Sequence, residues 1–231
     1  RLHLSPAGRI LLEYSDRLLT LSEEAERAVR DLHPRGTFRL GAMESTAAVR
    51  LPAPLTEYSD RYPDVTIELK TGNPTELSRA LLAGEIEAAL VAAPVAETKF
   101  DSVVAFDEEP VIVTAQNYPE IADKSGTPET MIVFEHGCPH RRQLEAWYEN
   151  REDLPDRTLE LGSYHAILGC VLAGMGAALV PKSVLASFAE ASRLRLYSLP
   201  SGQDKLSTLL IWRKGARSSK IDGLVDILNS V

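Results

Sequence analysis

Apolar residues recur at alternating steps of three and four along the first 32 residues. The stripe consists of Leu11, Tyr14, Leu18, Leu21, Ala25, Ala28 and Leu32. Charged residues fill most positions between them, which is the pattern of the a and d positions of a heptad repeat. Ser5 and Pro6 suit the cap and the first position of this helix. So narrow an apolar seam favours pairing with another helix over packing on its own domain, which needs a wider apolar face.

After a break at residues 33–36, the hydrophobic period switches repeatedly between that of a strand and that of a helix. The pattern predicts a strand over 38–42, a helix from about 47 to 62, a strand over 65–69, a helix through 77–82 and a short buried strand over 88–93. Strands that alternate with helices indicate an α/β domain with parallel strand pairing.

The remainder of the chain repeats this alternation. Strands are predicted at 103–106, 110–115, 131–134, 158–161, 177–181, 194–199 and 206–214, and helices at 140–150, 163–174, 183–191 and 220–231. Two similar α/β lobes fit these roughly 195 residues better than a single sheet would.

The composition is that of a globular protein without a membrane span. The chain has 231 residues, of which 44% are hydrophobic and 25% charged, and no apolar run approaches the ~18 residues that a span requires. The formal net charge of -8 is a poor match for DNA, which is bound mainly through Lys and Arg. Two cysteines do not make a disulfide framework, so we expect a reducing cytoplasm.

Five stretches, in the same order along the chain, resemble the LysR-type transcriptional regulators. They are residues 4–19 (LSPAGRILLEYSDRLL), 38–69 (FRLGAMESTAAVRLPAPLTEYSDRYPDVTIEL), 81–94 (LLAGEIEAALVAAP), 134–148 (FEHGCPHRRQLEAWY) and 162–185 (GSYHAILGCVLAGMGAALVPKSVL). The first looks like the end of the winged helix-turn-helix and the start of the linker helix. The others look like segments of the effector-binding domain.

The resemblance implies a two-lobed, periplasmic-binding-protein-like α/β sensor domain preceded by a long dimerisation helix. We expect the linker at 1–35, the first lobe at 36–113 together with 207–231, and the second lobe at 114–206. On this interpretation the DNA-binding domain is mostly absent from the chain. Its absence also explains the acidic charge, because the part that touches phosphate is missing.

The function implied is that of the effector-sensing and oligomerisation part of a LysR-type regulator, which binds a small organic ligand, predicted to be an anion, between its lobes. The implied partners are a second copy in a homodimer or homotetramer, and promoter DNA through the missing domain. RNA polymerase is left open as a further partner, and no membrane or cofactor is expected. Two alternatives are a free-standing solute-binding protein and a thiol-based redox sensor that acts through Cys138.

Ser45 and Thr46 lie at a predicted strand-to-helix turn. Hydroxyls and free backbone N–H groups at a helix start can hold an anion, but they can equally cap the helix without any ligand. The family's effector cleft faces this turn, which favours ligand contact, whereas the carboxylate of Glu44 disfavours a multiply charged anion nearby. Thr71, at the next such turn, is assigned as a ligand contact on the resemblance alone.

The stretch His136-Gly-Cys-Pro-His-Arg-Arg142 is the densest in reactive side chains. Cys138 precedes a predicted helix, and the helix field together with nearby Arg and His side chains is expected to lower the pKa of its thiol. Cys138 is then inert packing, a redox or electrophile sensor, or a metal ligand with His136 and His140, although this spacing is unlike common zinc signatures. Arg141 is the better candidate for ligand binding, because a guanidinium can clamp a carboxylate.

Ser163 begins another predicted helix. We expect it to cap that helix and to lie in the cleft between the lobes. Cys170 is expected in the core, and a disulfide between Cys138 and Cys170 is left open. The chain contains no G-x-S-x-G, P-loop, G-x-G-x-x-G or H-E-x-x-H motif. We therefore expect a protein that is not an enzyme.

Overall fold

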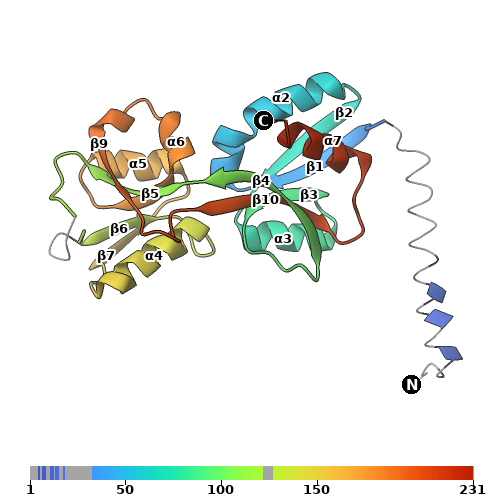
Figure 1. Ribbon diagram of the computed structural model, residues 1–231, viewed down its shortest axis with the longest axis horizontal. Coiled ribbons are helices and arrows are strands. Elements are labelled where there is room, and N and C mark those ends of the chain that lie inside the picture. Colours follow the sequence, from blue (N-terminus) through green and yellow to red (C-terminus); the bar gives the residue numbers. More distant parts are fainter. Residues whose placement is uncertain are drawn as a thin grey trace.

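Two α/β lobes lie side by side and are joined where long strands pass from one to the other (Figure 1). The computed structural model describes residues 5, 7–8, 11–12, 14–15, 18, 33–121 and 127–230. Within these residues, no helix combines the length and the apolar character needed to cross a membrane. The predicted two-lobed α/β fold is confirmed.

The first lobe is built on a five-stranded sheet in the order β2-β1-β3-β10-β4. Its strands are β1 (Gly36–Ala42), β2 (Val65–Thr71), β3 (Ala88–Ala92), β4 (Phe100–Glu108) and β10 (Leu206–Arg213). β1 pairs in parallel with β2 and β3, as the alternation of strands and helices predicts. β10 returns from the second lobe and lies antiparallel between β3 and β4.

Helices cover both faces of this sheet. The segments η1 (Thr46–Arg50), α2 (Pro52–Arg61) and α7 (Ser219–Leu228) cover one face, and α3 (Pro74–Ala83) covers the other. β3 therefore has no solvent-facing side: Ala88 and Leu90 pack under α2 and α7, while Ala89 and Val91 pack under α3. This double burial explains why its sequence is a continuous apolar run.

The second lobe contains an antiparallel sheet, β8-β5-β9, and a parallel pair, β6-β7. These strands are β5 (Pro110–Ala115), β6 (Thr130–Val133), β7 (Arg157–Glu160), β8 (Ala178–Pro181) and β9 (Leu194–Ser198). A single bridge between Met131 and Ala177 links the pair to the sheet. α5 (Tyr164–Leu172) and α6 (Lys182–Ala186) cover one face, α4 (Pro139–Arg151) covers the other, and the short η3 (Ala191–Arg193) precedes β9.

The strands change lobe at Glu109. All of β5 pairs with β8 and β9, whereas the boundary expected after residue 113 falls inside this strand. The reason is that β4 and β5 read as one nearly continuous extended stretch, in which the apolar pattern alone marks no change of sheet. The chain returns to the first lobe through residues 199–205, so two connections join the lobes.

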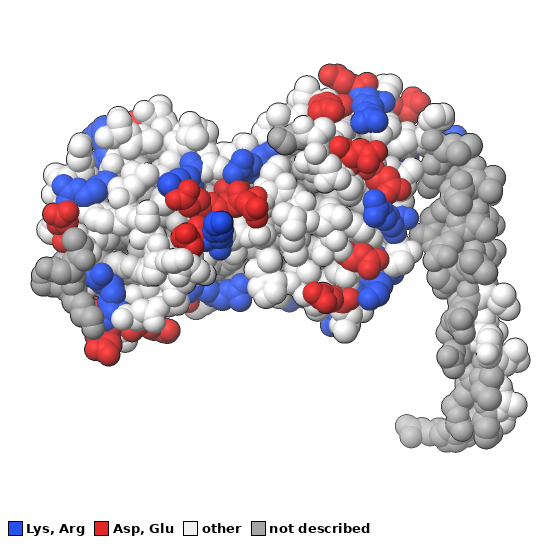
Figure 2. All heavy atoms as spheres, viewed as in Figure 1, with Lys and Arg blue, Asp and Glu red and all other residues white. Residues whose placement is uncertain are grey.

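Polar contacts centred on Glu108 lie beside this crossing, and the hydrogen bond from Ser183 joins the two lobes. Arg50 Nε lies 2.6 Å from Glu108 Oε1, and Ser183 of α6 donates to Glu108 Oε2 at 2.8 Å. Lys182 pairs with Glu109 close by. Figure 2 shows acidic and basic side chains gathered in the middle of the molecule, over the strands that join the lobes.

Two predicted helices differ from the structure. The expected single helix over 47–62 is a π-helical turn followed by α2, and the Leu51 N–H donates to the Thr46 carbonyl at 3.0 Å. Pro52 causes the change, because it lacks an N–H and its ring would clash with a carbonyl of a continuous α-helix. The helix expected over 183–191 ends as α6 at Ala186.

Only the first turns of the predicted N-terminal helix are described. Ser5 caps it as expected, since the Gly8 N–H donates to Ser5 Oγ at 3.1 Å. Leu11, Tyr14 and Leu18 of the apolar stripe are 68%, 56% and 66% exposed. The rest of the stripe, Leu21, Ala25, Ala28 and Leu32, lies outside the described residues.

Candidate functional site

A cavity of about 380 Å³ lies between the two lobes. Its walls are residues 43–45 and 71–74 of the first lobe and residues 134–135, 138–140, 160–162 and 164 of the second. Most of these segments follow the C-terminal end of β1, β2, β6 or β7. Open α/β sheets generally bind small molecules at the carboxyl ends of their strands, so the strand order itself creates this site.

The structure brings three of the predicted site residues to the cavity. Ser45, Thr71 and Cys138 line it. The other four predicted residues, Thr46, His136, Arg141 and Ser163, are not among the described residues that form its walls. Thr46 is the first residue of η1 and is buried, at 3% exposure.

Ser45 lies inside the first helical turn. The Ala47 N–H donates to the Met43 carbonyl at 2.9 Å, and the φ and ψ of Ser45, -58° and -44°, are helical. Ser45 makes no side-chain capping hydrogen bond, so the interpretation of Ser45 as a cap is wrong. Its hydroxyl instead lies within hydrogen-bonding reach of the Tyr164 hydroxyl, across the cavity in the second lobe.

Glu44 faces the N-terminus of α5 in the opposite lobe. Burial raises the pKa of its carboxyl group, and the Tyr164 backbone N–H and the charge of His165 oppose this rise only in part. Glu44 Oε2 is buried without a hydrogen-bond partner among the described residues. A carboxylate of the protein therefore already occupies the helix terminus that was expected to receive an anion.

His140 and Tyr164 form a buried pair in the cavity wall. The Tyr164 hydroxyl lies 2.6 Å from His140 Nδ1, and both residues are 4% exposed. Burial lowers the pKa of His140 to about 4 and raises the pKa of Tyr164 well above its ordinary value. At neutral pH both groups are thus uncharged, and His140 adds no positive charge to the site.

Burial reverses the expectation for Cys138. Cys138 is the N-cap residue of α4, as predicted. Burial raises its pKa, and the backbone N–H groups of Arg141 and His140 lower it by less, as do the charges of Arg142 and Arg141. The prediction of a lowered pKa is wrong, because it counted the nearby positive charge without the loss of water around the sulfur.

Arg141 is 7% exposed and is held by groups of its own lobe. Its Nε lies 2.8 Å from Glu145 Oε1, and its Nη1 lies 2.7 Å from Glu160 Oε2. Nη1 also donates to the Phe134 carbonyl at 3.0 Å, and Nη2 lies 3.1 Å from His136 Nε2. Because these partners occupy the guanidinium, the arrangement fixes the wall of the cavity and does not present a free clamp to a ligand.

Ser163 caps α5, as the sequence predicts. The Ala166 N–H donates to its Oγ at 3.2 Å. Thr71 ends β2 and lines the cavity beside the N-terminus of α3. That terminus is closed by a capping box, in which Asn73 Oδ1 accepts from the Glu76 N–H at 3.0 Å and Glu76 accepts from the Asn73 N–H at 3.2 Å.

Two acidic wall residues were missed by the sequence analysis. Glu135 follows β6 and accepts a hydrogen bond of 3.3 Å from Asn73 Nδ2 in the opposite lobe. Glu160 ends β7 and pairs with Arg141. A signal for both was present, because each comes at the end of a predicted strand, where ligands of α/β proteins bind.

A sequence model described as the LysR substrate binding domain matches residues 32–231. The chain belongs to the LysR family of transcriptional regulators. The HTH-type transcriptional regulator GltR of Bacillus subtilis (strain 168) is 36% identical over 213 residues, which cover 91% of this chain and 72% of GltR. Since the relatives are regulators of transcription, the expectation of a protein that is not an enzyme is confirmed.

Solved structures of LysR-family domains share the fold. The regulatory domain of CcmR from Synechocystis PCC6803, in complex with 2-PG, has a TM-score of 0.74 at 22% identity, over 85% of this chain and 97% of that domain. The BenM effector binding domain with its effector benzoate has a TM-score of 0.70 at 18% identity, over 86% of this chain and 92% of that domain. The periplasmic-binding-protein-like architecture is therefore that of the LysR effector-binding domains.

The described part of this LysR chain tests two alternatives from the sequence, a disulfide between the two cysteines and a metal site. Cys138 and Cys170 are both free thiols, so the disulfide left open above does not form here. Cys170 is only partly buried, packed against the core beneath α5. No group of three or more His, Cys, Asp or Glu side chains among the described residues is placed to hold a metal ion.

Proposed function

We propose that this chain is the effector-sensing part of a LysR-type regulator, and that a small organic effector binds in the cavity between its lobes. The observation that carries the proposal is the cavity of about 380 Å³, whose walls come from both lobes. This volume falls within the range of pockets that bind small molecules. Apolar walls from Met43, Phe134 and Leu161 favour an organic ligand.

The connections between the lobes suit a sensor. The chain crosses between them twice, once at Glu109 and once through residues 199–205. A ligand that contacts both lobes can bias their relative angle, provided that its affinity differs between the two arrangements. Occupancy of the cavity can in this way be transmitted to the segment that precedes β1.

The partners proposed are those of the sequence analysis. The N-terminal helix pairs with its copy in a homodimer or homotetramer, and promoter DNA is bound through an N-terminal domain outside this chain. RNA polymerase is a further candidate partner, and the cytoplasm is the proposed location. The redox alternative through Cys138 has less support, because burial raises the pKa of its thiol and a redox-active cysteine needs thiolate character.

A thermal-shift screen with small organic acids, amines, amino acids and aromatic compounds tests the proposal. A cavity ligand should raise the unfolding temperature, because a molecule that binds only the folded state stabilises it. Ser45→Ala should weaken binding of that ligand by about 1 kcal/mol, the net value of one neutral hydrogen bond. Ser59→Ala on the exposed face of α2 is the matched control. Equal binding by the Ser45 variant, the control and the parent would place the site elsewhere.

A further inference from the structure

The described walls of the cavity between the lobes carry carboxylates but no basic side chain of Lys or Arg. Three carboxylates line it, Glu44 from the first lobe and Glu135 and Glu160 from the second, and there is no Lys or Arg among the described lining residues. Arg141 compensates Glu160 from behind the wall, but it pairs with Glu145 as well. An anionic ligand in this cavity would meet like charge from both lobes.

The helix N-termini around the cavity offer few donors to an anion. The capping box of Asn73 and Glu76 closes the start of α3. At α5, Ser163 accepts from the Ala166 N–H and the Tyr164 N–H faces Glu44. At α4, the N–H groups of His140 and Arg141 are directed at Cys138. The protein's own groups thus occupy the positions that would otherwise receive an anion.

Two buried polar atoms on the cavity walls lack a partner among the described residues. They are Glu44 Oε2 and His140 Nε2, and His140 is only 4% exposed. Buried polar atoms are nearly always hydrogen-bonded in folded proteins. Both atoms belong to residues that line the cavity, and the unpartnered oxygen of Glu44 calls for a donor.

Aromatic rings complete the walls. Phe134 and Tyr164 pack with ring centroids 4.6 Å apart, and both line the cavity with the carboxylates. Rings attract an ammonium group through their negative faces, and carboxylates accept its N–H groups. A bare metal ion does not use apolar walls, and the described residues hold no cluster suited to one.

We propose that the effector carries a protonated amine on a hydrocarbon skeleton, with the ammonium group held between Glu44 of the first lobe and Glu135 of the second. This rests on the proposed function and names the chemical class of its ligand. It replaces the sequence-based expectation of an anion. An ammonium group bound by carboxylates from both lobes also favours the closed arrangement, because it neutralises like charges that the two lobes bring to one cavity.

Matched triplets of compounds test the charge of the ligand directly. Each triplet consists of a primary amine, an alcohol and a carboxylate on the same skeleton, with butyl, benzyl and 2-phenylethyl skeletons as the series. Thermal shift followed by titration calorimetry on the full chain should rank the amine at least tenfold tighter than the carboxylate of the same skeleton. Glu44→Gln and Glu135→Gln should each weaken amine binding at least tenfold, with the fold checked by circular dichroism. Glu57→Gln on the exposed face of α2 should change nothing.

The outcomes separate this inference from the proposed function. The charge assignment is overturned if the carboxylates bind more tightly than the matched amines. If those carboxylates also compete with one another and bind more weakly to Ser45→Ala, the cavity remains the effector site. Amine binding that is unchanged in both Glu variants also overturns the assignment. If neither the triplets nor the broader screen yields a ligand of the folded chain, the inference and the proposed function fail together.

Discussion

The thiol of Cys138 at the start of α4 is subject to two opposing effects. Burial raises its pKa, and the neighbouring backbone N–H groups and arginine charges offset only part of this rise. Because the thiolate is the reactive form, we expect alkylation of Cys138 by iodoacetamide at pH 7.5 to be slower than alkylation of a free cysteine. The rate should increase with pH, with a midpoint above that of an unperturbed thiol. Peptide mapping over a pH series measures this, and a midpoint below pH 7 would contradict it.

His140 should make the stability of the fold depend on pH. Its pKa in the folded protein is about 4, whereas an unfolded His titrates near ~6.5. Between these values the unfolded chain binds more protons, so stability falls as the pH falls. For this one group, the free energy of unfolding falls by about 2 kcal/mol between pH 7 and pH 5. Urea unfolding at both pH values should show that this part of the pH dependence disappears in His140→Gln.

The exposed His33, which precedes β1, provides the control for that experiment. His33→Gln should keep the pH dependence of the parent protein. Loss of the same pH dependence in His33→Gln, or its persistence in His140→Gln, would assign the titration to another group.

Single residues of the site were predictable only where the chain itself marks them. Ser45, Thr71 and Cys138 adjoin helix starts that the local pattern locates, and they line the cavity. Arg141 was chosen for its chemistry, but a partner 19 residues away, Glu160, holds it. The pairing of Asn73 with Glu135 spans 62 residues, and no local pattern contains such a contact. Charge balance in a cavity depends on such long-range contacts, so the local sequence pattern does not determine which ligand charge the cavity favours.

At the scale of helices and strands, replacing either of two glycines of the second lobe with alanine should change the stability of the fold in opposite directions. A Cβ on Gly176 would lie 2.1 Å from the backbone carbonyl oxygen of Thr130, whereas a Cβ on Gly169 would meet nothing within 4 Å. Gly176→Ala should lower the free energy of unfolding by about 1–3 kcal/mol, the usual cost of overpacking. Gly169→Ala, on the exposed face of α5, should stabilise by up to about 1 kcal/mol, because alanine favours helix. Urea unfolding measures both, and equal effects would contradict the contact between β6 and β8.

The N-terminal helix should determine self-association. Its described apolar positions, Leu11, Tyr14 and Leu18, are 68%, 56% and 66% exposed in the single chain, as expected of a seam that pairs with another helix. Leu18→Asp, or removal of residues 1–33, should weaken association, because a buried charge without a partner is costly. Sedimentation at micromolar concentration measures the mass, and an unchanged mass for both variants would contradict the prediction. Glu13→Gln, between the apolar positions, is the control.

Periodicity predicted the elements more fully than it predicted their pairing. The alternation at Phe38 and Leu40 correctly placed β1, and the continuous apolar run of β3 correctly indicated a buried strand. The insertion of β10 between β3 and β4 joins residues at least 98 positions apart, and its position depends on which sheet edge is open when the chain returns. The split at Pro52 was readable in principle, because proline breaks the regular hydrogen-bond ladder of a helix.

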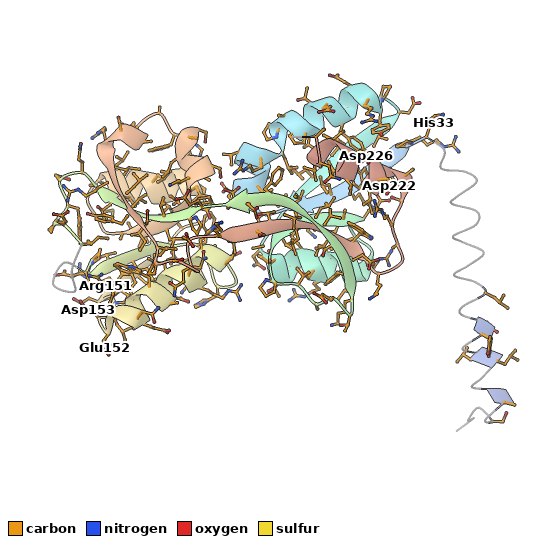
Figure 3. The ribbon with its side chains drawn as sticks, in the orientation of Figure 1. His33, Arg151, Glu152, Asp153, Asp222 and Asp226 are labelled. Carbon is orange, nitrogen blue, oxygen red and sulfur yellow. The ribbon has the colours of Figure 1, made fainter. Side chains whose placement is uncertain are left out.

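The tie at Glu108 acts on the scale of the whole molecule. This carboxylate is 8% exposed and accepts from Arg50 of the first lobe at 2.6 Å and from Ser183 of the second at 2.8 Å. Figure 3 places Arg151, Glu152 and Asp153 at the C-terminal end of α4, away from this crossing. The contacts of Glu108 with Arg50 and Ser183 connect η1 to α6. η1 begins beside the cavity residues Glu44 and Ser45. A ligand that shifts the start of η1 would act on this contact between the lobes.

Arg50→Met should therefore destabilise the protein by about 1–3 kcal/mol, because it leaves the buried Glu108 with one partner fewer. Ser183→Ala should cost less, and the two changes together should be non-additive, since both partners share one carboxylate. Lys182→Met is the matched control: it removes an ion pair with Glu109 in which both side chains are about half exposed, 47% and 50%, and such pairs contribute about 0–1 kcal/mol. Urea unfolding of the single and double variants measures these terms. Additive effects of Arg50→Met and Ser183→Ala, or a Lys182→Met cost equal to that of Arg50→Met, would mean that Glu108 does not couple the lobes.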